Sequence, residues 1–442
     1  MKWFMPGRNR RRQVLVSMAA ATAFLVAACS SAGTSSSSAA PASSASSSSA
    51  SAPASSPTAS SPASSAGPIK IGLGATVIPG VYDAQTQYTA GITAAEGYIN
   101  THGGWGGRTV QLVQCQSPGD PASDLKCYHS IIGAQPVAIM GLLENSATYL
   151  PLLVKAQIPS FLFAGSAGEE QSPWSMSLGG IVESYTAAAK YACAKGYKNV
   201  TVFQQDVPSS RESEAAFAAG IFSACKIQVN NVYMPLGTAD PAPYIQKAVA
   251  SNPQLLFMSG QAAPITTFLS EFTAAHFPID KVLTVPTSAP GWLSNAASNG
   301  LLIMGGQAGY PAPQSSDADN KTFLQYMAKY SPGADPTAAL TLPAFQDILT
   351  IWEVGKAIGF NNLTGQAVEN YMNNVAPGHL NIFDTHGDVV VPPVWVGVKD
   401  PYEHIVQWTG SQFTDDGWWG GDWTCTSAST CASVTPPAGS KT

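Results

Sequence analysis

The stretch GYINTHGGWGGRTVQLV, residues 97–113, gathers five glycines around one tryptophan where a helix-like pattern gives way to a strand-like one. Glycine lacks a Cβ and reaches positive φ at little cost, so such a cluster marks a tight reversal, a close backbone approach or a phosphate-binding loop. Because the cluster precedes the strand-like segment, it lies at the amino end of that strand, opposite the edge where parallel sheets bind ligands.

The sequence also lacks the motifs that a phosphate-binding loop requires. No Lys-Ser/Thr pair follows the glycines, as a P-loop requires, and Val77 stands where a dinucleotide fingerprint beginning at Gly72 needs its third glycine. The cluster therefore predicts a turn from helix to strand, formed by Gly103, Gly104, Gly106 and Gly107.

Strand-like and helix-like segments alternate on both sides of this turn. The strand-like segments are residues 69–75, 109–114, 136–142, 160–165, 199–205, 227–234, 255–260 and 281–287. Tyr88, Ile92, Ala95 and Ile99 fall on one helical stripe between the first two strands, and Leu125, Tyr128 and Ile132 lie on a second helix. This order predicts an α/β protein whose parallel sheets are wrapped by helices. Since single cores do not grow to this length, we expect two Rossmann-like lobes.

Residues 1–28 have the pattern of an export signal. A basic start is followed by the apolar stretch 14–28, which ends in the small residues before Cys29. The ending resembles a bacterial lipoprotein signal, which implies cleavage before Cys29 and attachment of lipid to its thiol. The apolar stretch is too short to span a bilayer, so we expect a protein anchored to the outer face of the cell membrane. The pair Arg11-Arg12 leaves general and twin-arginine export both open.

Residues 29–67 are almost wholly Ser, Ala, Pro, Gly and Thr after the cysteine, a composition that has nothing to bury. We interpret them as a flexible tether. The whole chain of 442 residues contains only 11% charged residues and has a formal net charge of −6. It lacks the basic face that nucleic-acid binding requires, so DNA and RNA are not expected partners.

Six cysteines remain besides Cys29, and disulfides persist in exported proteins. Their spacing favours three local pairs, although six cysteines allow 15 connectivities and buried free thiols are the alternative. The favoured pairs are Cys115 with Cys127, Cys193 with Cys225, and Cys425 with Cys431. No C-x-x-C motif is present, which argues against a zinc or redox site.

Several motifs together resemble the branched-chain amino-acid (Leu/Ile/Val-binding) type of substrate-binding protein of ABC transporters. A helix ending at Asn100 is followed by Gly103-Gly104, by Gly107-Arg108 and by a strand from Thr109. The resemblance continues through Asp120-Pro121, residues 141–148, residues 158–167 and the turn at 382–388. It covers nearly all of residues 68–410.

The resemblance implies a type I periplasmic-binding-protein fold, in which two α/β lobes joined by three crossovers close over a small solute. Lobe 1 is expected to comprise residues 68–181 and 307–385, and lobe 2 residues 182–306 and 386–432, with a C-terminal tail at 433–442. The expected partners are a small-molecule solute and an ABC-type membrane permease, with the membrane contacted through the lipid anchor. We expect a monomer without a cofactor.

In that family the first lobe holds polar groups of the ligand through backbone N–H groups and hydroxyls after the third and fourth strands. The matching residues are Asn145, Ser146, Gly165, Ser166 and Ala167. A helix beginning near Asn145 exposes N–H groups that favour an anion or a polar oxygen. Ordinary helix capping is the alternative role for these residues.

The second lobe departs from the amino-acid-binding pattern. Positions that would receive a ligand ammonium group align with Ile181, Ser209, Gln261 and Ser288, none of which is a carboxylate. A buried ammonium without a partner is costly, so the sequence favours a polar or weakly anionic solute over a zwitterionic amino acid. Glu183 or Asp206 would supply a carboxylate if the alignment is shifted.

Large aromatic residues in the loops after the strands are candidates for stacking on the apolar part of a ligand. Tyr82 and Trp292 are the two we select, with core packing as the alternative for each. His379 and His386 lack the clustered ligands of a metal site, so no metal is expected.

The sequence also bears on two other functions, those of a serine hydrolase and of a ligand-sensing receptor. Residues 164–168, AGSAG, miss the G-x-S-x-G elbow of a serine hydrolase because Ala164 replaces its first glycine, and Asp384 and His386 follow in triad order. Their closeness in sequence is atypical of a triad, so we expect Ser166 not to be a nucleophile and the protein not to be an enzyme. A ligand-sensing receptor of the same fold remains an alternative to transport.

Overall fold

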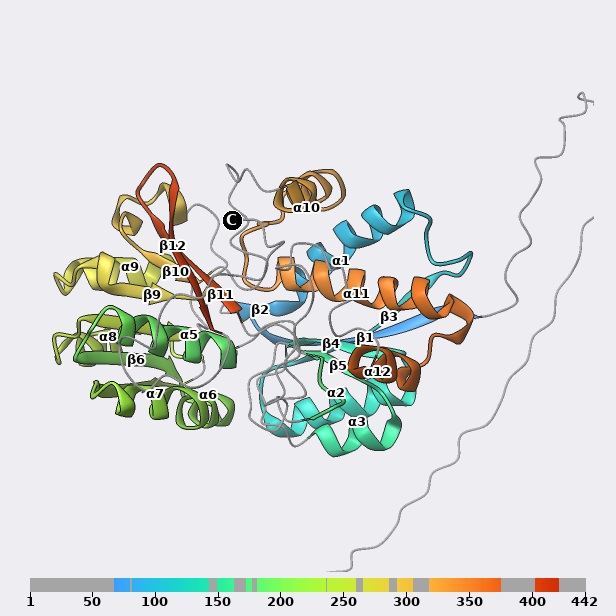
Figure 1. Cartoon of the computed structure of the whole chain (residues 1–442), viewed down its shortest axis with the longest axis horizontal. Coiled ribbons are helices and arrows are strands. Elements are labelled where there is room, and N and C mark those ends of the chain that lie inside the picture. Colours follow the sequence, from blue (N-terminus) through green and yellow to red (C-terminus); the bar gives the residue numbers. More distant parts are fainter. Residues whose placement is uncertain are drawn as a thin grey trace, which may run out of the picture. The chain divides into compact units, whose positions relative to one another are not determined.

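The computed structural model describes most of the chain between residues 67 and 420 (Figure 1). The described ranges are 67–79, 82–142, 149–162, 172–176, 181–235, 237–259, 265–285, 292–304, 318–374 and 402–420. They contain a five-stranded sheet and a seven-stranded sheet, each built mostly of parallel strands. The predicted α/β class with two sheets is therefore confirmed.

The first sheet is centred on β1 (Ile69–Ile78). β3 (Val110–Ser117) and β4 (Ala138–Leu142) flank it in parallel, with Ile71 opposite both Leu112 and Ala138. β5 (Ser160–Leu162) extends the sheet beyond β4, and β2 (Tyr82–Asp83) folds back antiparallel onto the end of β1. All four parallel strands thus present their carboxyl ends at one edge.

Helices from two separate stretches of sequence cover the first sheet. The early ones are α1 (Ala84–Thr101), α2 (Pro121–Gly133) and α3 (Leu150–Ala156), and the late ones are α10 (Ala318–Tyr330), α11 (Thr341–Ile358) and α12 (Gly365–Asn374). α11 lies along α1 so closely that a Cβ on Gly91 would collide with the carbonyl oxygen of Thr341. Residues 318–374 therefore belong to the core around the first sheet.

The glycine-rich stretch forms the predicted turn between α1 and β3. Gly103, Gly104, Gly106 and Gly107 all have positive φ, which side chains with a Cβ rarely adopt. Trp105 between them is 3% exposed, and its indole Nε1 donates a hydrogen bond to Oε2 of Glu96 at 3.2 Å. The turn is therefore part of the core rather than a ligand loop.

Two further contacts fasten this turn to the late helices. Nε1 of Trp352 in α11 donates to the carbonyl oxygen of Gly104 at 2.8 Å. Nη1 of Arg108 donates to the carbonyl oxygen of Phe360 at 2.6 Å, just after α11 ends. The conformational freedom of the glycines thus serves packing between segments that lie about 250 residues apart along the chain.

The buried faces of the helices include most of the residues that the sequence placed on them. Tyr88, Ile92, Ala95 and Ile99 of α1 are all buried, as predicted. In α2, however, Leu125 and Ile132 are only partly buried, and the inward face is formed by Asp124, Cys127, Tyr128 and Ile131. All three residues that the sequence placed on this helix lie in α2, and Tyr128 is buried, while the disulfide from Cys127 to Cys115 lies on the same inward face.

The second sheet has the order β12-β11-β10-β9-β8-β6-β7. Its first five strands along the chain are parallel, and β11 and β12 add an antiparallel hairpin at the β10 edge. The strands are β6 (Asn199–Gln205), β7 (Gln228–Met234), β8 (Leu255–Ser259), β9 (Val282–Thr284), β10 (Leu302–Met304), β11 (Tyr402–Trp408) and β12 (Phe413–Gly420). Residues 402–420 therefore return to the second sheet after the helices of the first.

Helices cover both faces of this sheet. They are α5 (Ile181–Ala194), α6 (Pro208–Ser213), α7 (Ala219–Ala224), α8 (Ala242–Val249) and α9 (Ile265–Ala274), with a π-helical stretch at Glu214–Ala218 between α6 and α7. One core cluster packs around Val202 and Phe257, and the other around Phe203 and Phe268. Among the described helices, none joins enough length to enough apolar character to cross a bilayer.

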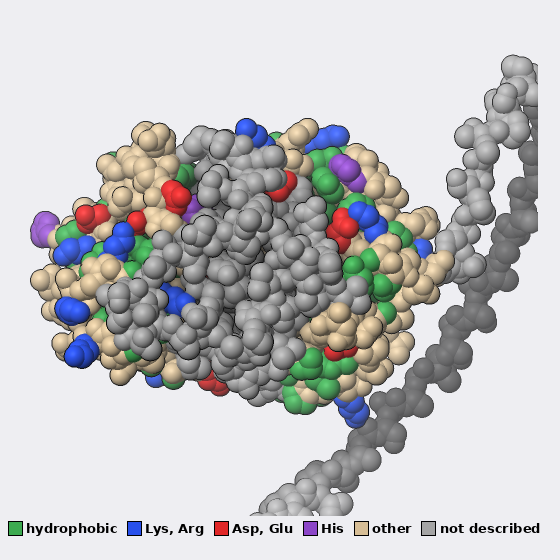
Figure 2. Space-filling view, in the orientation of Figure 1, with side chains coloured by type: hydrophobic (Ala, Val, Ile, Leu, Met, Phe, Trp, Pro, Cys, Tyr) green, Lys and Arg blue, Asp and Glu red, His purple; other side chains and the backbone are tan. Residues whose placement is uncertain are grey.

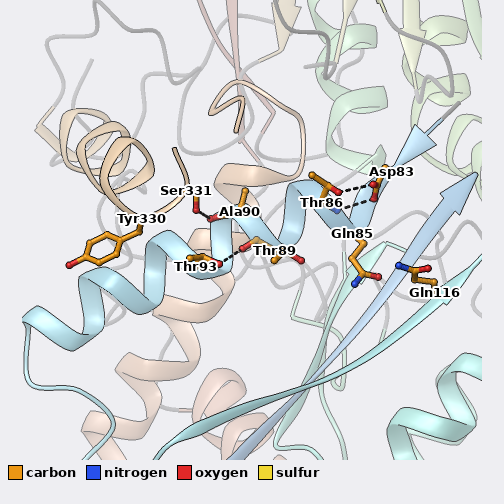
Figure 3. Close-up of a pocket in the computed structure, with 9 residues that line it drawn as sticks. All are labelled: Asp83, Gln85, Thr86, Thr89, Ala90, Thr93, Gln116, Tyr330 and Ser331. Atoms are coloured by element: carbon orange, nitrogen blue, oxygen red, sulfur yellow. Dashed lines mark hydrogen bonds between the residues drawn. The ribbon is translucent and has the colours of Figure 1, made fainter. Parts of the chain in front are cut away.

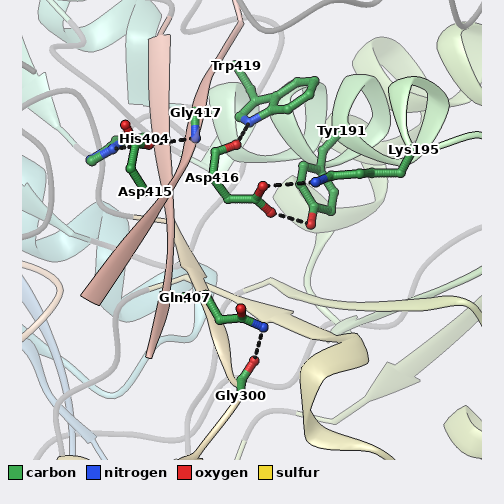
Figure 4. A network of polar contacts seen from close by, with 9 residues as sticks. All are labelled: Tyr191, Lys195, Gly300, His404, Gln407, Asp415, Asp416, Gly417 and Trp419. Atoms are coloured by element: carbon green, nitrogen blue, oxygen red, sulfur yellow. Dashed lines mark hydrogen bonds and ion pairs between the residues drawn. The ribbon is translucent and has the colours of Figure 1, made fainter. Parts of the chain in front are cut away.

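A polar network fastens the terminal hairpin to α5 (Figure 4). Asp416 of β12 accepts hydrogen bonds from the Tyr191 hydroxyl at 2.6 Å and from Nζ of Lys195 at 2.8 Å. Burial, followed by the nearby Asp416 carboxylate, raises the pKa of Tyr191 and keeps its hydroxyl neutral. Across the hairpin, Nε2 of His404 lies 3.0 Å from Oδ1 of Asp415.

Two disulfides link neighbouring elements. Cys115 of β3 is bonded to Cys127 of α2, and Cys193 of α5 to Cys225 at the end of α7, with Cα–Cα distances of 5.4 and 5.7 Å. These are two of the three pairs that spacing favoured. Cys425 and Cys431 lie outside the described residues, as does Cys29, so their roles stay predictions. The lobe boundaries also stay predictions, because residues 177–180, 305–317 and 375–401 are not described.

A glycine in β4 sets the spacing of the first sheet and gives a direct test of its packing. Gly141 has a φ of +126°, and a Cβ there would overlap the carbonyl oxygen of Gly74 in β1. We expect Gly141→Ala to lower the free energy of unfolding by about 3 kcal/mol, because both the backbone and the strand spacing become strained. Denaturant unfolding of the purified protein measures this.

The matched control is Gly133→Ala at the end of α2. A Cβ there meets nothing within 4 Å, and its φ is not positive. Its effect should stay within about 1 kcal/mol and favour the folded state, since alanine is the better helix former. Equal stability of the two variants would contradict the packing described for β1 and β4.

Candidate functional site

The carboxyl edge of the first sheet contains a pocket at the end of β1. It has a volume of about 460 Å³, within the usual range for small-molecule sites. Tyr82 lines it, together with Val77 and Ile78 of β1 and the segment Gly333–Thr341 before α11. Of the two aromatic residues that the sequence selected for stacking, Tyr82 thus lies beside a pocket of suitable size.

A second pocket of about 420 Å³ adjoins it along the first turns of α1 (Figure 3). The two pockets share Asp83, Thr86 and Ala90. Asp83 caps α1, since its Oδ1 accepts from the backbone N–H of Thr86 at 2.9 Å and its Oδ2 from the Thr86 hydroxyl at 2.6 Å. Among the described residues that line the second pocket, the one carboxylate is therefore already occupied by helix capping.

The residues predicted to hold the ligand in the first lobe follow the next two strands of this edge. Asn145 and Ser146 come after β4, and Gly165, Ser166 and Ala167 after β5; all five lie outside the described residues. β4 and β5 are parallel neighbours, with Ile139 opposite Ser160. Because their carboxyl ends share the edge that carries Tyr82, the sheet order is consistent with a common site.

A buried carboxyl group at the end of β3 was missed by sequence reasoning. Asp124 in the first turn of α2 has no exposed surface. Burial raises its pKa to about 6, and the Ser117 hydroxyl acts in the opposite direction. The signal was present in the sequence, because Asp124 precedes Cys127, Tyr128 and Ile131 by three, four and seven positions and so shares their face.

At the second sheet, the strands that precede the predicted ligand residues end side by side. β6, β8 and β9 are parallel neighbours that end at Gln205, Ser259 and Thr284. Ser209 follows β6 in α6, although its side chain is not described, while Gln261 and Ser288 follow β8 and β9 outside the described residues. Their roles stay predictions, as do those of Ile181 and Glu183, whose side chains are not described.

A buried neutral cluster lies at this edge. The Tyr185 hydroxyl of α5 donates to Oε1 of Gln204 in β6, and both side chains are fully buried. Burial raises the pKa of Tyr185, and the neighbouring hydroxyls of Ser259 and Ser210 act in the opposite direction. The cluster therefore supplies polar groups without charge at physiological pH.

The charges at the end of β6 are paired. Asp206 directly follows the strand, and its Oδ1 accepts from Nε of Arg211 at 2.8 Å and lies 2.7 Å from Nη2. The guanidinium carbon of Arg211 lies 3.8 Å from the ring centroid of Tyr233 in β7. Asp206, one of the two carboxylates left open as an ammonium partner, is thus engaged by a cation of the protein itself.

A third carboxylate reaches the same edge from the far end of the chain. Glu403 is the second residue of β11, which runs antiparallel to β10, so it lies near the carboxyl end of β10. It is 3% exposed and accepts a hydrogen bond from the Ser184 hydroxyl of α5 at 3.2 Å. Sequence reasoning missed Glu403 because 219 positions separate it from Ser184.

Other aromatic candidates pack in the core. Trp292 is 4% exposed within the cluster around Phe203 and Phe268, which favours the packing interpretation over ligand stacking. Tyr149 is buried and stacks on Tyr128, with ring centroids 4.2 Å apart. In the described part of the chain, no three His, Cys, Asp or Glu residues are grouped so as to hold a metal ion.

Comparison with known proteins gives a family match over most of the body. Residues 68–384 match the family model described as periplasmic binding protein. The chain is also similar to a Leu/Ile/Val-binding protein homolog 6 from Brucella abortus, with 26% identity over 298 residues, covering 64% of this chain and 74% of the relative.

Solved structures agree with this fold. A leucine-binding protein from Thermotoga maritima superposes with a TM-score of 0.61 at 16% identity, covering 79% of this chain and 98% of that one. A solute-binding protein of an ABC transporter from R. palustris, solved in complex with benzoate, gives a TM-score of 0.63 at 14% identity, covering 80% and 96%.

The raised pKa of Asp124 predicts a pH-dependent stability. The folded protein binds this proton more tightly than the unfolded chain, so the group lowers stability as pH rises from about 4 to about 6, and the loss persists above that. We expect Asp124→Asn to stabilise the protein at pH 7.5 by up to about 3 kcal/mol and to change little at pH 4. Thermal unfolding at both pH values, with the exposed Glu212→Gln as control, tests this; an equal effect of Asp124→Asn at both would contradict it.

Proposed function

Because the chain belongs to the periplasmic binding protein family and has its type I fold, we propose that it is an exported, lipid-anchored solute receptor that delivers a small solute to an ABC-type permease. The proteins of this family are solute-binding proteins. The observation that carries the proposal is the family match over residues 68–384 on two mostly parallel sheets, since such sheets bind ligands at their carboxyl edges.

The anchor is inferred from the sequence before the body. Cys29 ends a signal-like segment, and residues 30–67 provide a tether without apolar residues to bury. By the relation for flexible linkers, this tether has a root-mean-square span of roughly 35 Å, so the receptor samples the membrane surface without being fixed to it. Such freedom suits a receptor that must meet a separate permease.

We further propose that the solute is polar or weakly anionic rather than a zwitterionic amino acid. Two observations support this: Asp206 is paired with Arg211, and Glu403 is buried against Ser184. In the R. palustris complex, a protein of similar fold holds benzoate, an anion that lacks an ammonium group. The proposed ligand residues are Asn145, Ser146, Gly165, Ser166, Ala167, Tyr82, Ser209, Gln261 and Ser288.

A solute screen tests the function. The purified body, residues 29–442 with Cys29 replaced by serine, is screened by thermal shift against amino acids, amides, small acids and aromatic solutes. We expect stabilisation of at least several degrees by one class, since a ligand that binds only the folded state raises its stability. Calorimetry should then give a dissociation constant, and chromatography should recover the ligand unchanged.

Two outcomes would contradict the proposal. Turnover of an ester that is lost in Ser166→Ala would instead indicate a hydrolase. Submicromolar binding of leucine, isoleucine or valine would overturn the proposed ligand class while leaving the receptor function intact.

A separate experiment distinguishes transport from sensing. Loss of solute uptake on deletion of a neighbouring permease would indicate transport.

A further inference from the structure

Arg211 is held in one orientation by two independent contacts at the carboxyl edge of the second sheet. Nε and Nη2 both face Oδ1 of Asp206, at 2.8 and 2.7 Å. The Tyr233 ring covers one face of the guanidinium, 3.8 Å from its central carbon. An arginine on a surface helix normally samples many rotamers, so this one has lost most of that freedom before any ligand arrives.

The two contacts leave part of the guanidinium available. An arginine has five N–H donors, and those of Nη1 take no part in the contact with Asp206. Half of the Arg211 side chain is exposed, so it lies at the surface rather than in the core. A planar fork of N–H donors is the protein group best matched to a carboxylate.

The position of Arg211 relates it to the predicted ligand residues. It lies two residues after Ser209 in α6, the helix that directly follows β6, while Tyr233 lies at the carboxyl end of β7. β6 and β7 are parallel neighbours, so Asp206, Arg211 and Tyr233 all lie on the edge where solutes bind in such sheets. Among its described lining residues, the pocket at the end of β1 has no comparable locked cation.

We propose that Arg211 is a specificity-determining residue that binds a carboxylate group of the solute and thereby makes the receptor selective for carboxylic acids over their amides. The proposal rests on the receptor function proposed above and narrows its ligand class. Asp206 orients the guanidinium and also competes for it, because a solute carboxylate adds a second negative charge beside the pair. The Tyr233 ring restricts the orientation of the guanidinium when the solute is absent.

The purely structural alternative is that the ion pair stabilises α6. Half-exposed ion pairs of this kind contribute roughly 0–1 kcal/mol to the free energy of unfolding. If the pair only stabilised α6, it would not contact the solute, and its loss would leave ligand selectivity unchanged. The two explanations therefore separate on binding rather than on stability.

The experiment compares matched pairs of probes by calorimetry: benzoate with benzamide, 4-hydroxybenzoate with its amide, and short aliphatic acids with theirs. The proteins are wild type, Arg211→Gln, Arg211→Lys and Asp206→Asn. The control is Lys195→Gln, which removes another ion pair to an aspartate, that with Asp416 of β12, beside the ring of Tyr191 in α5. Circular dichroism and thermal unfolding establish that each variant is folded.

We expect the wild type to bind at least one acid more than tenfold tighter than its amide. Arg211→Gln should lose that preference, Arg211→Lys should retain part of it, and Asp206→Asn should tighten acid binding because the competing carboxylate is gone. Lys195→Gln should behave as wild type.

The proposal is overturned if amides bind the wild type as well as acids do, or if Arg211→Gln leaves the preference unchanged. In either case binding itself persists, so the receptor function stands while the role of Arg211 falls. If no solute of any class binds the wild type, the receptor function fails and this inference fails with it.

Discussion

A parallel sheet has to be packed against other elements on both of its faces, and this constraint keeps a solute away from the faces of the sheets. Every residue of β8 is buried, with one apolar cluster on each side of its sheet. In the first sheet, α11 approaches α1 so closely that only glycine fits at position 91. The faces are therefore occupied, and the amino end of β3 is closed by the turn around Trp105. Room is left at the edges: two pockets of about 460 and 420 Å³ lie at the end of β1 and along α1, and one of about 840 Å³ lies at the amino edge beside Lys70 and Arg108.

Local patterns predicted the parts of the fold that depend on local chemistry. β6 covers the predicted residues 199–205, and the glycines after α1 form the expected turn. β10, β11 and β12 were not identified, because β10 has only three residues and β12 contains an Asp-Asp-Gly sequence that disfavours strands. Their place in the sheet comes from pairing with distant neighbours, which periodicity does not report.

The candidate site divides in the same way. Tyr82 was selected from the sequence and lines a pocket, whereas Trp292 was selected on equal grounds and packs in the core. An aromatic side chain offers the same apolar area to a ligand and to a core, so sequence alone does not distinguish the two uses. The ion pair of Asp206 and the burial of Glu403 were likewise hidden, since each depends on which side chain lies opposite in space.

Electrostatic balance unites the described groups at the edge of the second sheet. Asp206 is neutralised by Arg211, and Tyr185 and Gln204 are polar but uncharged. Glu403 lies beside Ser184 in the first turn of α5, where the partial positive charge of a helix start favours a carboxylate. On the face of the molecule shown in Figure 2, the described Lys and Arg side chains are scattered and interspersed with Asp and Glu. On this face (Figure 2), the described positive and negative side chains thus alternate and do not form a large patch of one sign, and at the sheet edge Asp206 and Arg211 compensate each other.

The terminal hairpin has a consequence for how the chain becomes a folded protein. β10 ends at Met304, but the strand that covers its open edge begins only at Tyr402, after the helices of the first sheet have been synthesised. Until then the growing second sheet ends in an unpaired strand, and closing so long a loop is slow. A chain exported by the general route must stay unfolded while it crosses the membrane. Because β11 and β12 follow the helices of the first sheet along the chain, the second sheet cannot be completed until nearly all of the described chain has emerged.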